Sequence, residues 1–167
     1  MRVLRGRIKL ARGDLFGAAA DAERAVAFGR LTGHPYDVLP ALAFAARAAL
    51  QEDARQAETL AAELFARLAS DQTFWAAWAL PDAVTVAAAL GLVAELVSVL
   101  SVVDAPTRWD RAALAHARGA TAEAAGIYRD MGALPEAAEA EGGTAFWEAV
   151  GARVRLEDAA APRPPRS

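Results

Sequence analysis

The feature of this sequence that most constrains its fold is a recurring break between predicted helices. Each break is followed by small or apolar residues at helical spacing. Residues 11–25 (ARGDLFGAAADAERA) are similar to residues 117–131 (ARGATAEAAGIYRDM), and both segments place a glycine five positions before an alanine. Steps of 39 residues from Gly13 reach positions 52 and 91, so the breaks lie near 13, 52, 91 and 119. Self-similarity at such a period indicates a stack of one repeated supersecondary unit, although the last interval is shorter than the others.

The residues after each break predict a helix with one apolar face. They fall at positions i, i+4 and i+7, which lie on the same side of a helix. The four sets are Ala18, Ala22 and Ala25; Ala57, Ala61 and Leu64; Leu96, Leu100 and Val103; and Ala124, Tyr128 and Met131. Alanine, which supplies 46 of the 167 residues, has the highest helix propensity. The sequence therefore predicts an all-α fold of antiparallel helical hairpins stacked as a solenoid, with about four hairpins.

Capping residues place the ends of these helices. Gly33 should end the long second helix, and Thr107 followed by Asp110 is typical of an N-cap. Pro81 and Pro135 are placed as prolines in the first turn of a helix. We expect helices at residues 2–12, 14–31, 37–50, 53–69, 74–79, 82–90, 93–103, 107–118, 121–131 and 135–150. The repeat domain should span residues 1–157, and the proline- and arginine-rich residues 158–167 should form a disordered tail.

The composition argues against several kinds of site. The net charge is −3 with acids and arginines intermixed, so no segment is basic enough to predict nucleic-acid binding. The chain has no cysteine, and its two histidines, His34 and His116, are too far apart in sequence to suggest a metal site. No phosphate loop, dinucleotide fingerprint or nucleophile elbow occurs. The sequence thus predicts no catalytic residue, no cofactor and no metal.

Three segments carry a resemblance to a known family: WALPDAVTVAAALGLVAELVSVL, TRWDRAALAHARGATAEAAGIYRDMGALPEAAEA and AFWEAVGARVRLEDA. Their succession resembles the tetratricopeptide-like C-terminal helical repeats of actinobacterial class III adenylate or guanylate cyclases and of large ATP-binding LuxR-type regulators. The family has a further helix and turn where only residues 142–145 intervene here, so the last hairpin should be truncated. The resemblance implies a cytoplasmic, non-catalytic interaction or regulatory module of a bacterial signalling protein, as a fragment of a larger chain. It also leaves open that any cyclase or transcriptional activity belongs to that parent protein.

In tetratricopeptide repeats the first helix of each hairpin lines a concave groove, and the resemblance therefore suggests four residues for binding a partner. They are Arg7, Trp78, Trp109 and His116. Aromatic and arginine side chains are frequent anchors for a docked peptide, whereas tryptophan in a repeat protein also serves simply to fill the core. The expected partner is a protein or peptide, a neighbouring domain of a parent chain, or a second copy.

Two further segments leave alternatives open. The first helix has no capping segment and exposes Val3, Leu4 and Ile8, so we expect either self-association through residues 1–31 or marginal stability of the isolated chain. Residues 83–103 carry a single charge, Glu95, and are long enough to cross a bilayer. A membrane-associated helical protein with a span there is the second alternative, although a central glutamate makes insertion costly.

Overall fold

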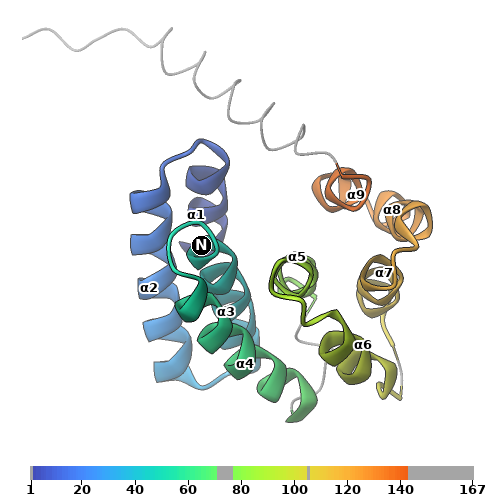
Figure 1. Cartoon of the computed structure of the whole chain (residues 1–167), viewed down its shortest axis with the longest axis horizontal. Coiled ribbons are helices and arrows are strands. Elements are labelled where there is room, and N and C mark those ends of the chain that lie inside the picture. The colour runs from blue at the N-terminus through green and yellow to red at the C-terminus, as the bar shows by residue number, and fades with distance from the viewer. Residues whose placement is uncertain (1, 71–76, 105, 143–167) are drawn as a thin grey trace, which may run out of the picture.

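The computed structural model of the chain describes residues 2–70, 77–104 and 106–142, and this part is built from helices joined by short turns (Figure 1). The helices are α1 (Arg2–Ala11), α2 (Leu15–Thr32), α3 (Pro35–Ala49), α4 (Ala54–Ser70), α5 (Leu80–Leu90), α6 (Val93–Ser101), α7 (Arg108–Ala117), α8 (Thr121–Asp130) and α9 (Leu134–Ala140). The described residues contain no strand, and the prediction of an all-α fold is confirmed.

The predicted breaks coincide with turns between helices. Gly13, Gly91 and Gly119 adopt φ angles of 76°, 73° and 80°, a left-handed conformation that costs glycine little because it lacks a Cβ. The fourth break, at residues 51–53, is the turn between α3 and α4. Helix ends follow the expected chemistry, since Gly33 ends α2 and Thr107 forms a capping box with Asp110 at the start of α7.

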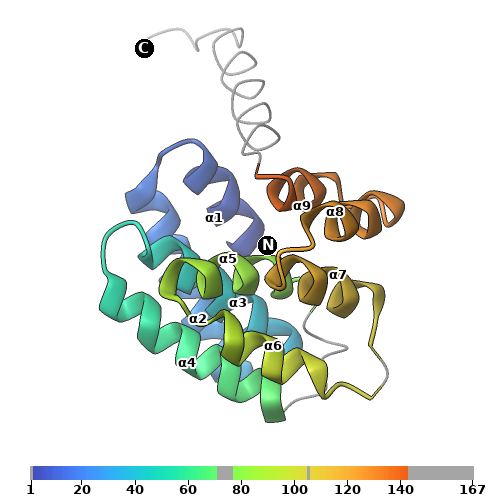
Figure 2. The ribbon, with the colours of Figure 1, turned by 45° about the vertical axis from the view of Figure 1, so that its right-hand side comes forward.

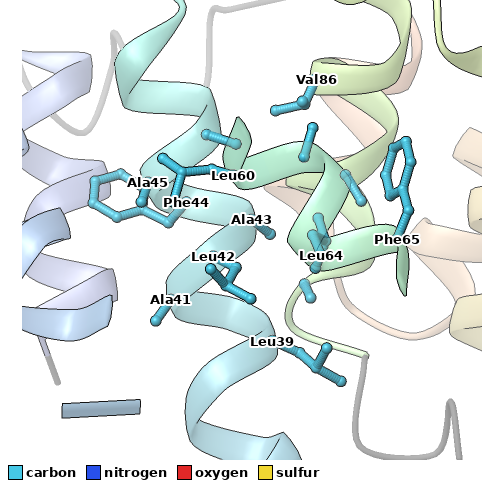
Figure 3. Close-up of a cluster of buried hydrophobic side chains, with 14 of the residues drawn as sticks. Leu39, Ala41, Leu42, Ala43, Phe44, Ala45, Leu60, Leu64, Phe65 and Val86 are labelled. Atoms are coloured by element: carbon cyan, nitrogen blue, oxygen red, sulfur yellow. The ribbon is translucent and has the colours of Figure 1, made fainter. Parts of the chain in front are cut away.

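The predicted apolar faces point into the core. In the four sets at i, i+4 and i+7, every residue is buried except Val103 and Met131, which are half-buried. The larger core cluster joins α2 to α6 and includes Ala113 of α7. Figure 3 shows Leu39 and Leu42 of α3 beside Leu64 of α4 within it. A second cluster lies among α7, α8 and α9 around the fully buried Tyr128.

The helices pack mainly on their neighbours in sequence. Helix α1 packs on α2 and α3, α3 packs on α4 and α5, and α5 packs on α7. Figures 1 and 2 show α1 to α4 on one side of the molecule and α7 to α9 on the other, with α5 between them. The odd-numbered helices α1, α3, α5 and α7 are therefore in contact one after another, while α9 packs on α8.

Two of the expected helices are wrong in part. The described portion of the helix expected at 74–79, residues 77–79, forms a turn, and α5 begins at Leu80 because Pro81 fits the first helical turn, where no N–H is needed. The last expected helix, 135–150, ends as α9 at Ala140, and Gly142 follows with a φ of 80°. Residues 143–150 and the predicted tail at 158–167 lie outside the described residues.

The helix bounds do not support the alternative of a single membrane span at residues 83–103. This segment is divided between α5 and α6, because Gly91 turns the chain in a left-handed conformation and forms the C-cap of α5. Within the described ranges, no helix is both long enough and apolar enough to cross a membrane.

Candidate partner-binding site

Asp82 is a single charge in the apolar first turns of α5, and it is buried, with 1% of its side chain exposed. A buried carboxylate is costly unless it is paired. Arg7 of α1 donates from Nε and Nη2 to Oδ2 of Asp82, at 3.0 and 2.6 Å, and Arg47 of α3 donates from Nη1 to Oδ1 at 2.8 Å. Burial raises the pKa of Asp82, but the positive charges of Arg7 and Arg47 outweigh it and leave that pKa below its ordinary value.

The chain of ion pairs continues from Arg47 to α9. Arg47 donates from Nη2 to Oε1 of Glu139 at 2.7 Å and from Nη1 to Oε2 at 3.2 Å. Burial lowers the pKa of the Arg47 guanidinium, and the charges of Asp82 and Glu139 more than offset this and raise it. Arg7, Asp82, Arg47 and Glu139 thus connect α1, α5, α3 and α9, which are distant in sequence.

These ion pairs form part of a depression of about 470 Å³, which we call the polar hollow. Its walls come from α1, α3, α5, α9, the start of α2 and the turns after α1 and α3. The lining residues are Arg7, Leu10, Ala11, Gly13, Leu15, Arg47, Leu50, Gln51, Pro81, Asp82, Thr85, Glu136 and Glu139. Burial raises the pKa of Glu136, and the negative charges of Glu139 and Asp82 raise it further, against an opposing effect of Arg7.

A second depression, of about 630 Å³, lies beside the first turns of α1 and α3, and we call it the apolar hollow. Its lining residues are Arg2, Val3, Leu4, Arg7, Ala25, Phe28, Tyr36, Asp37, Pro40, Ala41 and Trp78. Four of these are large apolar side chains that remain about half exposed: Leu4 (53%), Phe28 (54%), Tyr36 (52%) and Trp78 (53%). Arg7 lines both hollows, so the two are adjacent.

The structure brings three of the four residues suggested by the sequence close together. Arg7 donates from Nη2 to the backbone carbonyl of Trp78 at 2.8 Å. Trp78, in the turn before α5, stacks on Trp109 of α7 with ring centroids 6.3 Å apart. Trp109 in turn packs against the buried Tyr128, with centroids 5.7 Å apart, so it fills the core more than it faces a partner.

His116 lies farther along α7 and lines neither hollow. It is half-buried, and burial lowers the pKa of its imidazole, while the negative charge of Glu139 acts in the opposite direction. His116 therefore lies close enough to the ion-pair chain to feel the charge of Glu139, without itself facing the space that a partner would enter.

Sequence reasoning missed most of the residues that line the two hollows. Asp82 and Arg47 each stand as a lone charge inside an apolar run, PDAVTVAAAL and ALAFAARAAL, which is the pattern expected of a buried, paired charge. That signal would have marked both residues as paired. Glu136, Phe28 and Tyr36 carry no comparable signal, because exposed or half-exposed residues of these types occur on most helices.

The chain matches no family model, no curated protein and no solved structure. Its resemblance to the helical repeats of cyclases and LuxR-type regulators thus receives no test from these comparisons.

Proposed function

We propose that this chain is a non-catalytic interaction module that binds a peptide segment of a partner protein in the apolar hollow. The observation that carries the proposal is the gathering of half-exposed Leu4, Phe28, Tyr36 and Trp78 around one depression. Contact between large apolar side chains and water is unfavourable, so covering these side chains with an apolar residue of a docked peptide lowers the free energy. Aromatic residues in a concave, partly desolvated setting are the usual centres of binding energy in peptide recognition.

We further propose that the hairpins form a tetratricopeptide-like solenoid, in which this surface belongs to the groove. Support comes from the turns at the predicted breaks and from the contacts of α3 with α1 and α5, and of α5 with α7. Such an architecture would suit a cytoplasmic regulatory module of a bacterial signalling protein, joined to a parent chain that carries any cyclase or transcriptional activity. In that setting the partner peptide would belong to a neighbouring domain or to a separate protein.

The proposal is tested by selecting peptides on the full chain. A random-peptide display library is panned against the purified protein, and the enriched peptides are labelled and titrated by fluorescence anisotropy. We expect enriched peptides to share a bulky apolar residue. Phe28→Ser should weaken their binding by about tenfold or more, since it removes a half-exposed aromatic side chain from the lining of the hollow.

Phe16→Ser supplies the matched control. Phe16 lies on the same helix, is 86% exposed and does not line the hollow, so its replacement changes surface apolarity without changing the site. Circular dichroism checks that both variants keep their helix content. Equal effects of the two substitutions, or a failure to enrich any peptide, would contradict the proposal.

A further inference from the structure

The polar hollow carries more acid than base. Arg7 and Arg47 both bind Asp82, and Arg47 also binds Glu139, so these four side chains neutralise one another. The remaining charged group in the lining is Glu136. Among the residues that the structure describes, no arginine or lysine forms a salt bridge with it. One negative charge is thus left in the hollow.

The surroundings of Glu136 make this charge responsive to a ligand. The side chain is half-buried, and burial raises the pKa of its carboxyl. The carboxylates of Glu139 and Asp82 raise this pKa further, against the opposing effects of the Glu136 backbone N–H and of Arg7. A cation bound beside Glu136 would lower this pKa again, because it stabilises the ionised carboxylate. The attraction between the two charges is stronger where water is partly excluded.

The walls of the hollow fit a particular kind of cation. Leu10, Leu15, Leu50 and Pro81 provide apolar surface around the acidic residues. Lysine and arginine side chains combine an apolar stem with a charged end, so they can contact such walls while the charge reaches a carboxylate. A small hydrated metal ion would make no favourable contact with these apolar walls.

We propose that the polar hollow binds the lysine or arginine side chain of a partner peptide, with Glu136 as its counter-charge. This inference rests on the proposed function, since the same peptide would place an apolar residue in the apolar hollow and cross Arg7 to reach Glu136. An acidic ligand is disfavoured because Arg7 and Arg47 are already engaged, and it would have to displace the buried carboxylate of Asp82.

Three small probes with similar stems and different charges test the hollow directly. Butylguanidinium is the cation, pentanamide the neutral analogue and pentanoate the anion. Each is titrated into the full chain while the methyl resonances of Leu10, Leu15 and Leu50 are followed by NMR. We expect saturable shifts with butylguanidinium and much weaker ones with the other two. Glu136→Gln should weaken butylguanidinium binding roughly fivefold to tenfold, as expected for a partly buried charge pair.

Glu123→Gln is the matched control, because Glu123 occupies the first turn of α8 as Glu136 occupies that of α9. Both changes remove an acid from a helix N-terminus, so their effects on the helix dipole are similar. Glu123→Gln should leave probe binding unchanged. Stronger binding of pentanoate than of butylguanidinium, or equal effects of the two substitutions, would overturn the proposal.

The pH dependence gives a second readout. The titratable and charged groups around Glu136 are Arg7, Asp82 and Glu139, the phenol of Tyr128 on α8, and Arg47 in the lining of the hollow. Burial lowers the pKa of His116 on α7, and Glu139 in turn acts to raise it. Butylguanidinium should bind more tightly as the pH rises through the pKa of Glu136, and Glu136→Gln should flatten this rise. An unchanged profile in that variant would assign the titration to another group and overturn the role of Glu136.

A peptide experiment separates this proposal from the one on which it rests. In the peptides enriched on the full chain, each basic residue is replaced by glutamine and the affinity is measured again with the wild type and with Glu136→Gln. The replacement should weaken binding to the wild type and have little effect on the variant. If Phe28 matters but no basic residue couples to Glu136, the apolar hollow stands and the basic subsite falls.

Discussion

Replacing Asp82 by asparagine should be among the most destabilising conservative changes in this chain. The substitution keeps the size of the side chain but removes a buried charge that accepts three hydrogen bonds from Arg7 and Arg47. Both guanidinium groups are largely withdrawn from water, with 10% and 23% of their side chains exposed. Arg7 would be left without a counter-charge, and Arg47 would keep only Glu139. Breaking a buried ion pair by removing one partner costs about 3–5 kcal/mol.

Glu63 offers a matched comparison on the surface. It also binds two arginines, Arg30 and Arg67, but half of the Arg30 side chain and 35% of that of Arg67 are exposed. Water can therefore replace the lost partner, and exposed ion pairs contribute less than about 1 kcal/mol. Glu63→Gln should cost no more than this, although the number of arginines involved is the same.

The comparison is made by urea unfolding followed by circular dichroism at neutral pH, with thermal unfolding alongside. For a domain of this size, the loss expected for Asp82→Asn corresponds to a fall in melting temperature of about 10 °C. If the variant unfolds completely, Arg47→Met gives a milder test of the same ion pairs. If Asp82→Asn lowered the free energy of unfolding by less than about 1 kcal/mol, no more than Glu63→Gln, burial would not make the ion pairs of Asp82 more stabilising than exposed ones.

Three other predictions follow from the structure. Gly29→Ala should be strongly destabilising in thermal unfolding, because a Cβ there would lie 2.8 Å from Cα of Val38, whereas Gly126→Ala should stabilise the chain by about 0.5–1 kcal/mol because its Cβ would meet nothing within 4 Å. The pKa of Asp82 is lowered in the folded state, so its ionised carboxylate contributes to stability above the ordinary aspartate pKa of about 3.9. This contribution is lost as the pH falls through the lowered pKa. Urea unfolding at neutral and acid pH should show the loss, and Asp82→Asn should reduce it. The exposure of Leu4 on the hairpin of residues 1–31 predicts weak self-association that Leu4→Glu with Ile8→Glu abolishes; sedimentation showing a monomer at every concentration would contradict this.

The helices could be predicted from the sequence because their signals are local. Gly13, Gly91 and Gly119 mark turns through their own backbone freedom, and Thr107 caps a helix through a residue only three positions away. The errors arose where local signals compete or are weak. The helix expected at 74–79 is an example, because its described residues 77–79 form a turn and α5 begins only at Leu80, with Pro81 in its first turn. The division expected at Gly91, by contrast, is observed between α5 and α6.

The candidate site could be predicted only in part because it is assembled by contacts between distant segments. Arg7 and Trp78 were identified, and the hydrogen bond between them spans 71 positions in the sequence. No local pattern reveals that Asp82 takes Arg7 and Arg47 as partners, or that Glu139 shares Arg47. The charge left on Glu136 is visible only after all of these pairings are known.

The ion pairs of Arg47 should also hold Glu136 in position through α9. Arg47→Met tests this, because removing a positive charge from the hollow and loosening α9 should change cation binding in opposite directions. If the hollow were rigid, removing the positive charge of Arg47 would strengthen the binding of butylguanidinium. The structure favours the opposite result, since α9 is seven residues long, packs on α8, and is held to α3 by the ion pair of Arg47 with Glu139. We therefore expect Arg47→Met to weaken the binding of butylguanidinium and to accelerate amide hydrogen exchange in α9 more than in α4. Tighter binding with unchanged exchange in α9 would show that α8 alone positions Glu136.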